Sequence, residues 1–554
     1  MSAKITEKNW GASKKEGGVR RMVPALIGAG AALFVFVLYL RTLAPTVLPL
    51  DRTELPDSAM LQMQAGVLGI THPTGYPTYL MLGHLFTYLP FGDVAYRVNL
   101  ASAVFGALAA LVVYAAGYLC TRRAAPAATG ALTFGLGTTL WSQAVVAEVY
   151  TLNALLVSLT LLTLLLWRER LESTSGDRYL LLAAFGAGLC VTNHMTSGLM
   201  LPAILLFVGF VSWRKLLEWR LALKGAGLFL LGLTPYLYLP LRAAMNPAFE
   251  GNNPTSLDRF WYVVSGGNLT GTFFAFGPAE LPGRLAFYWG HLVENFNPLL
   301  LMVALTGAAV LVFRDRAFAA LTGFLFLGWL FHALENDIPD VELYFIPTYL
   351  ILCLWMAAGL GGLLEAAEDA TSRLRGTSGT LRTAILVILS AAMLLLPLPG
   401  LRDTYTANDM SESYEGREVM EIVAEKTARN STVLHHRSQL WYIVLVEERR
   451  QDLTIVDPFW HNTDIRYADL VWPDDSDLPD TDLRFGTDDL TGVKAAKLAS
   501  EKGRVYILDQ GIADPTKLRE GGFDIVRVEK GVLYELVPKG RREPERSATI
   551  GSPG

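Results

Sequence analysis

Long stretches with few or no charged residues recur through the first 400 positions of this 554-residue chain. An α-helix rises about 1.5 Å per residue, so about 20 such residues cross the roughly 30 Å hydrocarbon core of a bilayer. This pattern predicts a mainly α-helical polytopic membrane protein. The expected transmembrane helices number eleven, at 22–40, 98–119, 125–144, 151–167, 179–193, 196–212, 222–241, 286–313, 317–334, 343–363 and 383–399.

The first apolar stretch follows a basic tail, residues 1–21, as the apolar region of a signal peptide does. Its run is long and no A-x-A cleavage site follows, so we interpret it as a retained anchor. The stretch Thr78–Leu89 is too short to span and is expected at the membrane interface. Small residues such as Gly359, Gly361 and Gly362 are expected to serve helix packing, because no strand precedes them as in a phosphate-binding loop.

Lysines and arginines near span ends are retained on the cytoplasmic side of a membrane. With the N-terminus in the cytoplasm, eleven spans leave all six lysines and fourteen arginines of residues 1–400 inside, against six arginines outside. Counting Thr78–Leu89 as a further span would scatter these charges over both sides. The count therefore predicts an integral protein of the cell (inner) membrane, with a cytoplasmic basic tail at 1–21, a transmembrane domain at 22–400 and an extracytoplasmic C-terminal domain.

The C-terminal part has a different composition. Residues 401–554 carry 21 Lys and Arg against 29 Asp and Glu, whereas residues 1–400 carry 26 against 23. We expect a small soluble α/β domain at 401–543 and a disordered tail at 544–554. With a net charge of −5 and no basic block beyond the N-terminal tail, the sequence excludes nucleic-acid binding as the main function.

Alternating helix and strand patterns predict the elements of this C-terminal domain. The expected helices are at 417–429, 438–449 and 492–502, and the expected strands at 432–435, 453–457 and 504–509. A hairpin is expected from Phe523 to Val537, turning at Lys530 and Gly531.

Many polar residues lie on the predicted outer side of the membrane, in the outer loops 44–97 and 242–285 and at neighbouring span ends. Exposure to solvent in a loop does not readily explain them. They are Asp51, Glu54, Asp57, His72, Glu148, Asn193, His194, Arg242, Glu335, Asn336, Asp337, Asp340 and Glu342. We interpret them as an acid-rich cavity at the outer leaflet. The simpler alternative is that acids populate outer loops because nothing forbids them there.

Two motifs among these residues are specific. The first motif has two parts, residues 57–62 and, ten residues on, His-Pro-Thr-Gly-Tyr-Pro-Thr-Tyr at 72–79. The second motif is Trp-Ser-Gln-Ala-Val-Val-Ala-Glu-Val-Tyr-Thr-Leu-Asn at 141–153. Together they resemble a bacterial membrane-protein family of unknown function that is related to the animal transmembrane protein O-mannosyltransferase. Further similar segments are Asn193-His194, 235–242 and 344–347, and the resemblance covers roughly residues 22–350.

That family is similar to the GT-C glycosyltransferases, multi-span enzymes that pass a sugar from a polyprenyl-phosphate lipid to an acceptor on the outer face. The resemblance implies that an acid of the first outer loop, here Asp57, lies at the catalytic centre. The family often has a glutamate three residues after this aspartate, where this chain has Met60. Glu54, three residues before Asp57, is a candidate substitute.

The chemistry of these residues fits sugar transfer independently. The reaction passes through an oxocarbenium-like state, and the attacking hydroxyl must lose a proton to a base. We assign Asp57 as the base and Glu148 as the catalytic residue that positions acceptor or base. Arg242 is expected to bind the leaving phosphate, with His194 as a weaker partner. The other expected substrate-binding residues are Glu54, His72, Tyr76, Tyr150, Asn153, Asn193 and Asp337.

Each residue also has a structural interpretation: His72 shapes a turn, Glu148 caps a span, and Arg242 anchors at the interface. For the whole protein, the alternatives are a polytopic transporter and a catalytically inactive GT-C-fold scaffold. Transporters place polar residues near the bilayer midplane and often repeat internally, whereas here the acids lie at span ends and no repeat is found.

The expected function is therefore a membrane glycosyltransferase, with protein O-mannosylation as one form of the reaction. Its expected partners are a polyprenyl-phosphate sugar donor, a protein, lipid or glycan acceptor, and membrane lipids. No cofactor and no metal ion are expected.

Overall fold

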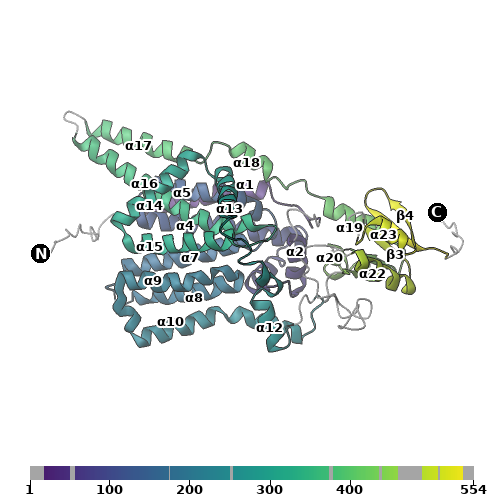
Figure 1. The fold of residues 1–554 in the computed structure, drawn as a ribbon. Helices are drawn as coiled ribbons and strands as arrows, with labels where there is room; N and C mark the ends of the chain where they lie inside the picture. Colours follow the sequence, from purple (N-terminus) through teal and green to yellow (C-terminus); the bar gives the residue numbers. More distant parts are fainter. Residues whose placement is uncertain are drawn as a thin grey trace.

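A computed structural model of the chain describes residues 18–49, 57–173, 175–249, 254–373, 378–435, 439–458, 489–508 and 512–540. It has two parts, an elongated bundle of helices that run roughly side by side and a smaller α/β domain beyond one end of this bundle (Figure 1). We call this end of the bundle the domain end.

The bundle helices carry apolar side chains on most of their surface, as expected of helices in lipid. The longer ones are α1 (Gly18–Arg41), α4 (Val94–Thr121), α5 (Ala124–Gly135), α7 (Tyr150–Glu169), α8 (Asp177–Asn193), α9 (Met200–Ser212), α10 (Trp219–Gly232), α13 (Leu281–Asn295), α14 (Pro298–Arg314), α15 (Arg316–Leu334), α16 (Ile346–Arg373) and α17 (Gly379–Leu395). The shorter ones are α2 (Ser58–Val67), α3 (Pro77–Phe86), α6 (Thr138–Ala144), α11 (Tyr238–Ala244), α12 (Leu257–Val264) and α18 (Leu401–Ala407), with 3-10 turns η1 (Met195–Leu199), η2 (Trp213–Leu217), η3 (Thr234–Leu237), η4 (Gly267–Thr272) and η5 (Val341–Phe345).

Among the described residues, six helical segments are long and apolar enough to cross a membrane, and the number rises to eight if each of two bent pairs of helices is one span. The six segments are Met22–Arg41, Val94–Thr121, Tyr150–Glu169, Met195–Leu217, Arg316–Leu334 and Val341–Arg373. The chain is therefore an integral membrane protein, as predicted. The predicted number of eleven spans is not confirmed, because helices such as α8 and α17 have only 17 residues each.

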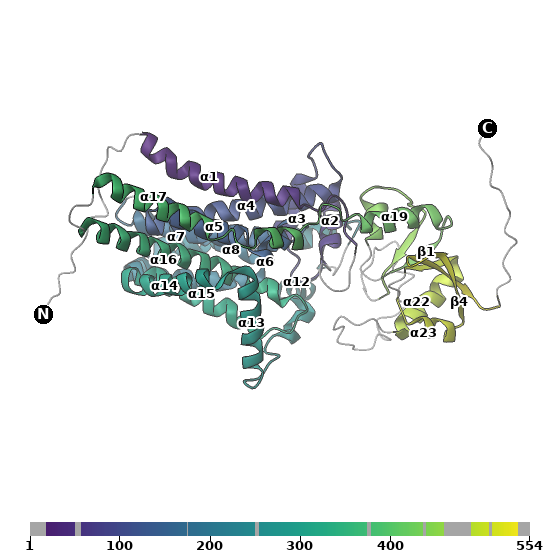
Figure 2. The same cartoon turned by 90° about the horizontal axis from the view of Figure 1, so that it is seen from above.

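Three predicted spans are not single helices, and one of them, 222–241, is bent by 40° between α10 and the segment Thr234–Ala244. Segment 286–313 is divided between α13 and α14, which meet at 109°, and Figure 2 shows α13 turned away from the bundle axis. Pro298 lacks the N–H that a continuous helix needs, and Asn297 Oδ1 accepts a hydrogen bond from Leu300 N at 3.0 Å, which starts a new helix. Segment 125–144 is interrupted between α5 and α6 at Gly137, which is extended rather than helical.

Small residues bring the helices of the bundle together. A Cβ on Gly307 of α14 would lie 1.7 Å from the carbonyl oxygen of Trp355 on α16, and one on Gly359 would lie 2.5 Å from that of Val303. Only glycine permits this approach, so the predicted packing role of Gly359 is confirmed.

The α/β domain contains a five-stranded sheet with the order β2-β1-β3-β5-β4. Its elements are α19 (Glu415–Lys426), β1 (Thr432–Leu434), α20 (Leu440–Leu445), β2 (Thr454–Val456), α22 (Asp489–Lys502), β3 (Val505–Leu508), α23 (Pro515–Glu520), β4 (Phe523–Glu529) and β5 (Leu533–Pro538). Strands β2, β1 and β3 are parallel, with Thr432 opposite both Thr454 and Val505, and β5 and β4 are antiparallel.

Neighbouring residues of the central strands face two separate cores, as the period of a strand requires. Val433 packs with α19 and α20, whereas Leu434 packs with α22 and α23. The predicted helices and strands of this domain are all present within a few residues, and the hairpin turns at Gly531, whose φ is +70°. Helix α23 was not predicted. The predicted disordered tail at 544–554 lies outside the described residues.

Candidate active site

The loop and helix that follow residue 56 place Asp57 against His72. Asp57 lies directly before α2, and its carbonyl accepts a hydrogen bond from Leu61 N at 2.8 Å. His72 Nε2 lies 3.4 Å from Asp57 Oδ2, while His72 Nδ1 lies 3.1 Å from Thr71 Oγ1. Because Thr71 occupies one ring nitrogen, the other faces the carboxylate. The side chains are 28 % (Asp57) and 19 % (His72) exposed, so this pair is reachable from solvent.

A second carboxyl group, that of Glu148, contacts Ser58, which follows Asp57 and is the first residue of α2. Ser58 Oγ donates a hydrogen bond to Glu148 Oε1 at 2.9 Å. The backbone of Glu148 is held by Ser102 of α4, whose hydroxyl accepts from Glu148 N at 3.1 Å and donates to Glu148 O at 3.2 Å. The two catalytic residues predicted from sequence are therefore brought to neighbouring positions by α2 and α4.

A third carboxyl group comes from the loop before η5. Tyr150 OH donates to Asp340 Oδ2 at 3.3 Å. Burial raises the pKa of Asp340 to about 6, and the negative charge of Asp57 adds to this shift. Burial, followed by the charge of Asp57, also raises the pKa of Glu148 well above its usual range. Both shifts favour the protonated forms of Glu148 and Asp340, and Asp57 is the accessible member of the three.

Aromatic side chains adjoin these carboxyl groups. The ring of Tyr76 lies 5.3 Å from that of His72, and the ring of His194 lies 5.5 Å from Tyr150 and 5.1 Å from Tyr344. Burial lowers the pKa of His194 to about 3, so this imidazole is neutral at physiological pH. It has no positive charge to offer a phosphate, in contrast to its predicted role as a weaker phosphate partner.

The two predicted asparagines lie behind this aromatic group and are buried. Asn193 Nδ2 donates to Val149 O at 3.1 Å, and Asn153 Oδ1 accepts from Ser197 Oγ at 2.7 Å. Asn193 therefore holds the backbone between Glu148 and Tyr150, and Asn153 connects α7 with η1.

Two of the predicted site residues that the structure describes are not brought into this group. Arg242 Nε donates to Leu68 O at 2.9 Å and its Nη2 donates to Val67 O at 3.3 Å, so its guanidinium caps the C-terminus of α2. Asp337 is exposed, and Asp340 of the same loop faces the site in its place. Glu54 lies outside the described residues.

Sequence reasoning left five residues of this region out of the predicted site. They are Ser58, Ser102, Asp340, Tyr344 and His332, whose ring stacks on Tyr344 at 5.7 Å. Asp340 stood in the acid-rich loop and Tyr344 opened a segment that carried the family resemblance, so a signal existed for both. Ser58 belongs to the first motif, whereas Ser102 and His332 have no distinguishing sequence signal.

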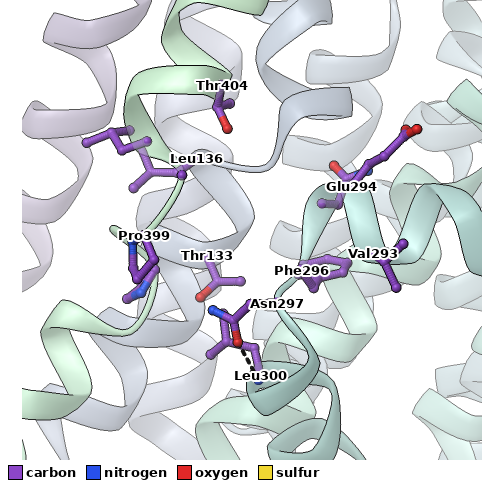
Figure 3. Close-up of a pocket in the computed structure, with 13 residues that line it drawn as sticks. Thr133, Leu136, Val293, Glu294, Phe296, Asn297, Leu300, Pro399 and Thr404 are labelled. Atoms are coloured by element: carbon purple, nitrogen blue, oxygen red, sulfur yellow. Dashed lines mark hydrogen bonds between the residues drawn. The ribbon is translucent and has the colours of Figure 1, made fainter.

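A cavity of about 200 Å³ lies elsewhere, at the bend between α13 and α14. Figure 3 shows its lining, which comes from α5, α13, α14, the segment between α17 and α18, and α18 itself. None of the thirteen residues that line it belongs to the predicted site.

The sequence of residues 57–217 matches the protein family described as "Protein O-mannosyl-transferase TMEM260 N-terminal domain". The matched segment is similar to the N-terminal domain of TMEM260. It begins at Asp57 and includes Glu148, Tyr150 and His194, so it contains most of the site described above. The family resemblance predicted from the two motifs is confirmed.

Two curated TMEM260 relatives match the chain. It is 32 % identical over 240 residues to "Protein O-mannosyl-transferase TMEM260" of Mus musculus, which is 43 % of this chain and 33 % of the mouse protein. It is 24 % identical over 443 residues to the Dictyostelium discoideum protein of that description, which is 72 % of this chain and 54 % of that protein. The chain thus spans about a third to a half of these relatives.

Solved structures share the fold. ArnT from Cupriavidus metallidurans bound to undecaprenyl phosphate has a TM-score of 0.55 at 14 % identity, covering 92 % of this chain and 97 % of ArnT. Archaeal oligosaccharyltransferase AglB from Archaeoglobus fulgidus, in complex with an inhibitory peptide and a dolichol-phosphate, has a TM-score of 0.53 at 12 % identity, covering 96 % and 76 %. The predicted GT-C-like arrangement of a helical membrane part and a C-terminal domain is therefore confirmed.

Proposed function

We propose that this protein is a membrane glycosyltransferase that moves a sugar from a polyprenyl-phosphate donor to an acceptor hydroxyl. The observation that carries this proposal is the convergence of Asp57, Glu148 and Asp340 at the domain end of the bundle, from segments far apart in the sequence. A cluster of carboxyl groups that differ in burial is what acid and base chemistry needs at one site.

In the proposed reaction Asp57 takes the proton of the acceptor hydroxyl. The hydroxyl oxygen then forms a bond to the anomeric carbon, and the bond from that carbon to the phosphate oxygen breaks. The electron pair of the broken bond leaves with the lipid phosphate. The transition state resembles an oxocarbenium ion, so the negative charge near Asp57 stabilises it.

Glu148 has a supporting role in this scheme. Since it is buried and burial raises its pKa, its protonated form is favoured and it is a weaker candidate for the base than the accessible Asp57. Its hydrogen bond with Ser58 fixes the first turn of α2, and so fixes the direction in which Asp57 points. We also propose that Tyr76 and Tyr150 contact the sugar, whereas Arg242, whose guanidinium caps α2, supports the helix that follows Asp57.

The donor and acceptor are proposed from the relatives. The TMEM260 proteins are named protein O-mannosyl-transferases, ArnT is bound to undecaprenyl phosphate, and AglB is bound to a peptide and a dolichol-phosphate. We propose mannose as the sugar and a protein hydroxyl as the acceptor.

We further propose that the domain end faces the outside of the inner membrane. In this arrangement residues 22–400 form the transmembrane domain and 401–543 the extracytoplasmic domain.

The test uses the purified full chain in lipid nanodiscs with radiolabelled mannosyl-phosphoryl-undecaprenol and a peptide rich in Ser and Thr. We expect label to move to the peptide, and Asp57→Asn to abolish most of this transfer. If the wild-type chain transfers no more label than Asp57→Asn, with mannose and with glucose or N-acetylglucosamine on the same lipid, the proposal is wrong.

A further inference from the structure

The C-terminal domain packs directly on α2, the helix that begins at Asp57. Met60 and Met63 of α2 are each 1 % exposed and belong to one apolar cluster with Met420 of α19 and with Trp441 and Tyr442 of α20. Figure 2 shows α2 at the domain end of the bundle, next to α19. One face of α2 thus belongs to the core of the C-terminal domain.

One cation joins the two parts of the molecule. Arg417, on the first turn of α19, places Nη2 2.8 Å from Asp93 Oδ2 of the bundle and pairs through Nη1 with Glu447 of its own domain. Its Nε donates to Thr46 Oγ1 at 3.2 Å. The side chain is 22 % exposed, so this ion pair is largely shielded from water.

Two sets of hydrogen bonds connect the partners of Arg417 with the site, one through Thr46 and one through Asp93. Thr46 belongs to the segment that holds Gln62 of α2, since Leu48 N donates to Gln62 Oε1 at 3.1 Å. Asp93 caps α4, accepting from Tyr96 N at 2.7 Å.

Helix α4 in turn presents two side chains to the site. Asn99 Oδ1 accepts from Gln62 Nε2 at 2.7 Å, and Ser102 binds the backbone of Glu148. Both α2 and α4 are therefore held at the end that Arg417 contacts.

We propose that Arg417 is a positioning residue, through which the C-terminal domain holds α2 and sets the position of Asp57 relative to Glu148. This inference rests on the proposed function, and it makes the C-terminal domain part of the catalytic unit. A displacement of about 1 Å at a reacting group can lower a rate by up to about 100-fold. Removing Arg417 leaves Asp93 and Glu447 close together without their shared cation, which favours separation of the two parts.

The experiment compares Arg417→Gln with Arg449→Gln in the full chain in nanodiscs. Arg449 is the matched control, because it pairs with Glu421 and Glu447, both within the C-terminal domain. Hydrogen–deuterium exchange of α2, residues 58–67, reports its position without any activity assay. Transfer from mannosyl-phosphoryl-undecaprenol gives kcat and KM, and Arg417→Lys tests whether charge alone suffices.

We expect Arg417→Gln to speed exchange in α2 and to lower kcat about 10- to 100-fold with KM for the lipid donor unchanged. Arg449→Gln should leave both values at wild-type level, and Arg417→Lys should recover part of the loss. The inference is overturned if exchange in α2 is unchanged in Arg417→Gln, or if Arg449→Gln has the same effects. Absence of transfer by the wild-type chain would refute the proposed function, while the exchange result would still decide whether Arg417 holds α2.

Discussion

Asp57 and His72, fifteen residues apart in the sequence, face each other with Oδ2 and Nε2 separated by 3.4 Å. The motif that contains His72 is therefore not only a turn, because it brings an imidazole to the carboxylate that we propose as the base. Thr71 beside His72 fixes which ring nitrogen faces Asp57. This pair is the accessible part of a site whose other carboxyl groups are more deeply buried.

The first prediction concerns Asp57. Asp57→Asn keeps the shape of the side chain and removes the base, so sugar transfer should fall by about 10²- to 10⁴-fold. Rates of label transfer from mannosyl-phosphoryl-undecaprenol measure this. Asp51→Asn and Glu54→Gln are controls for the loss of a nearby negative charge. If Asp57→Asn kept full transfer and Glu54→Gln abolished it, the catalytic role would belong to Glu54.

The second prediction separates charge from shape at Glu148. Glutamine reproduces a protonated glutamate and can still accept the hydrogen bond from Ser58, so Glu148→Gln should lower kcat at pH 7 by less than about tenfold. Glu148→Ala removes that acceptor and should lower kcat by about 100-fold. Equal damage by both substitutions would mean that the ionised carboxylate is required.

The third prediction is a pH dependence of stability that arises from Asp340. Its pKa is raised from 3.8 to about 6 in the folded protein, so folding favours the protonated form. The stabilisation is present below pH 4 and is lost as pH rises through 6, which amounts to roughly 2 to 3 kcal/mol. Asp340→Asn should remove this loss and raise the melting temperature at pH 8 relative to wild type.

Asp337→Asn is the matched control for that measurement, because Asp337 lies in the same loop and is exposed. Its effect on stability should stay within about 0.5 kcal/mol at any pH from 5 to 8. Thermal unfolding in nanodiscs at several pH values gives both curves. A wild-type curve that is flat between pH 5 and 8 would contradict the assigned ionisation of Asp340.

Much of the architecture followed from the sequence, because hydropathy and charge act locally along the chain. The hairpin at Gly531 and the packing role of Gly359 are examples in which one residue type permits one geometry. The break at Asn297 and Pro298 was not predicted. The segment 286–313 is mostly apolar, so its hydropathy indicates one span although Pro298 interrupts the helix.

The site was harder to predict, because it depends on which side of a short element faces inward. Three acids stand in the loop before η5, and only the fold determines that Asp340 faces Tyr150 while Asp337 stays exposed. Met60 illustrates the same limit. It lies two residues after Ser58, on another side of α2, so it joins the apolar contact with the C-terminal domain.

The last prediction concerns orientation. The structure places Arg122, Arg123 and Arg168 together at the end of the bundle opposite Asp57, where they pair with Glu169, Glu368 and Asp315. Pairing with these acids does not change the predicted orientation, because orientation in the membrane follows the number of lysines and arginines and depends little on acids. A reporter enzyme active only in the periplasm should therefore be inactive when fused after Arg123 and active when fused after Gly400. Activity after Arg123 alone would invert the protein in the membrane and place Asp57 on the cytoplasmic side, where the proposed outer-face reaction could not occur.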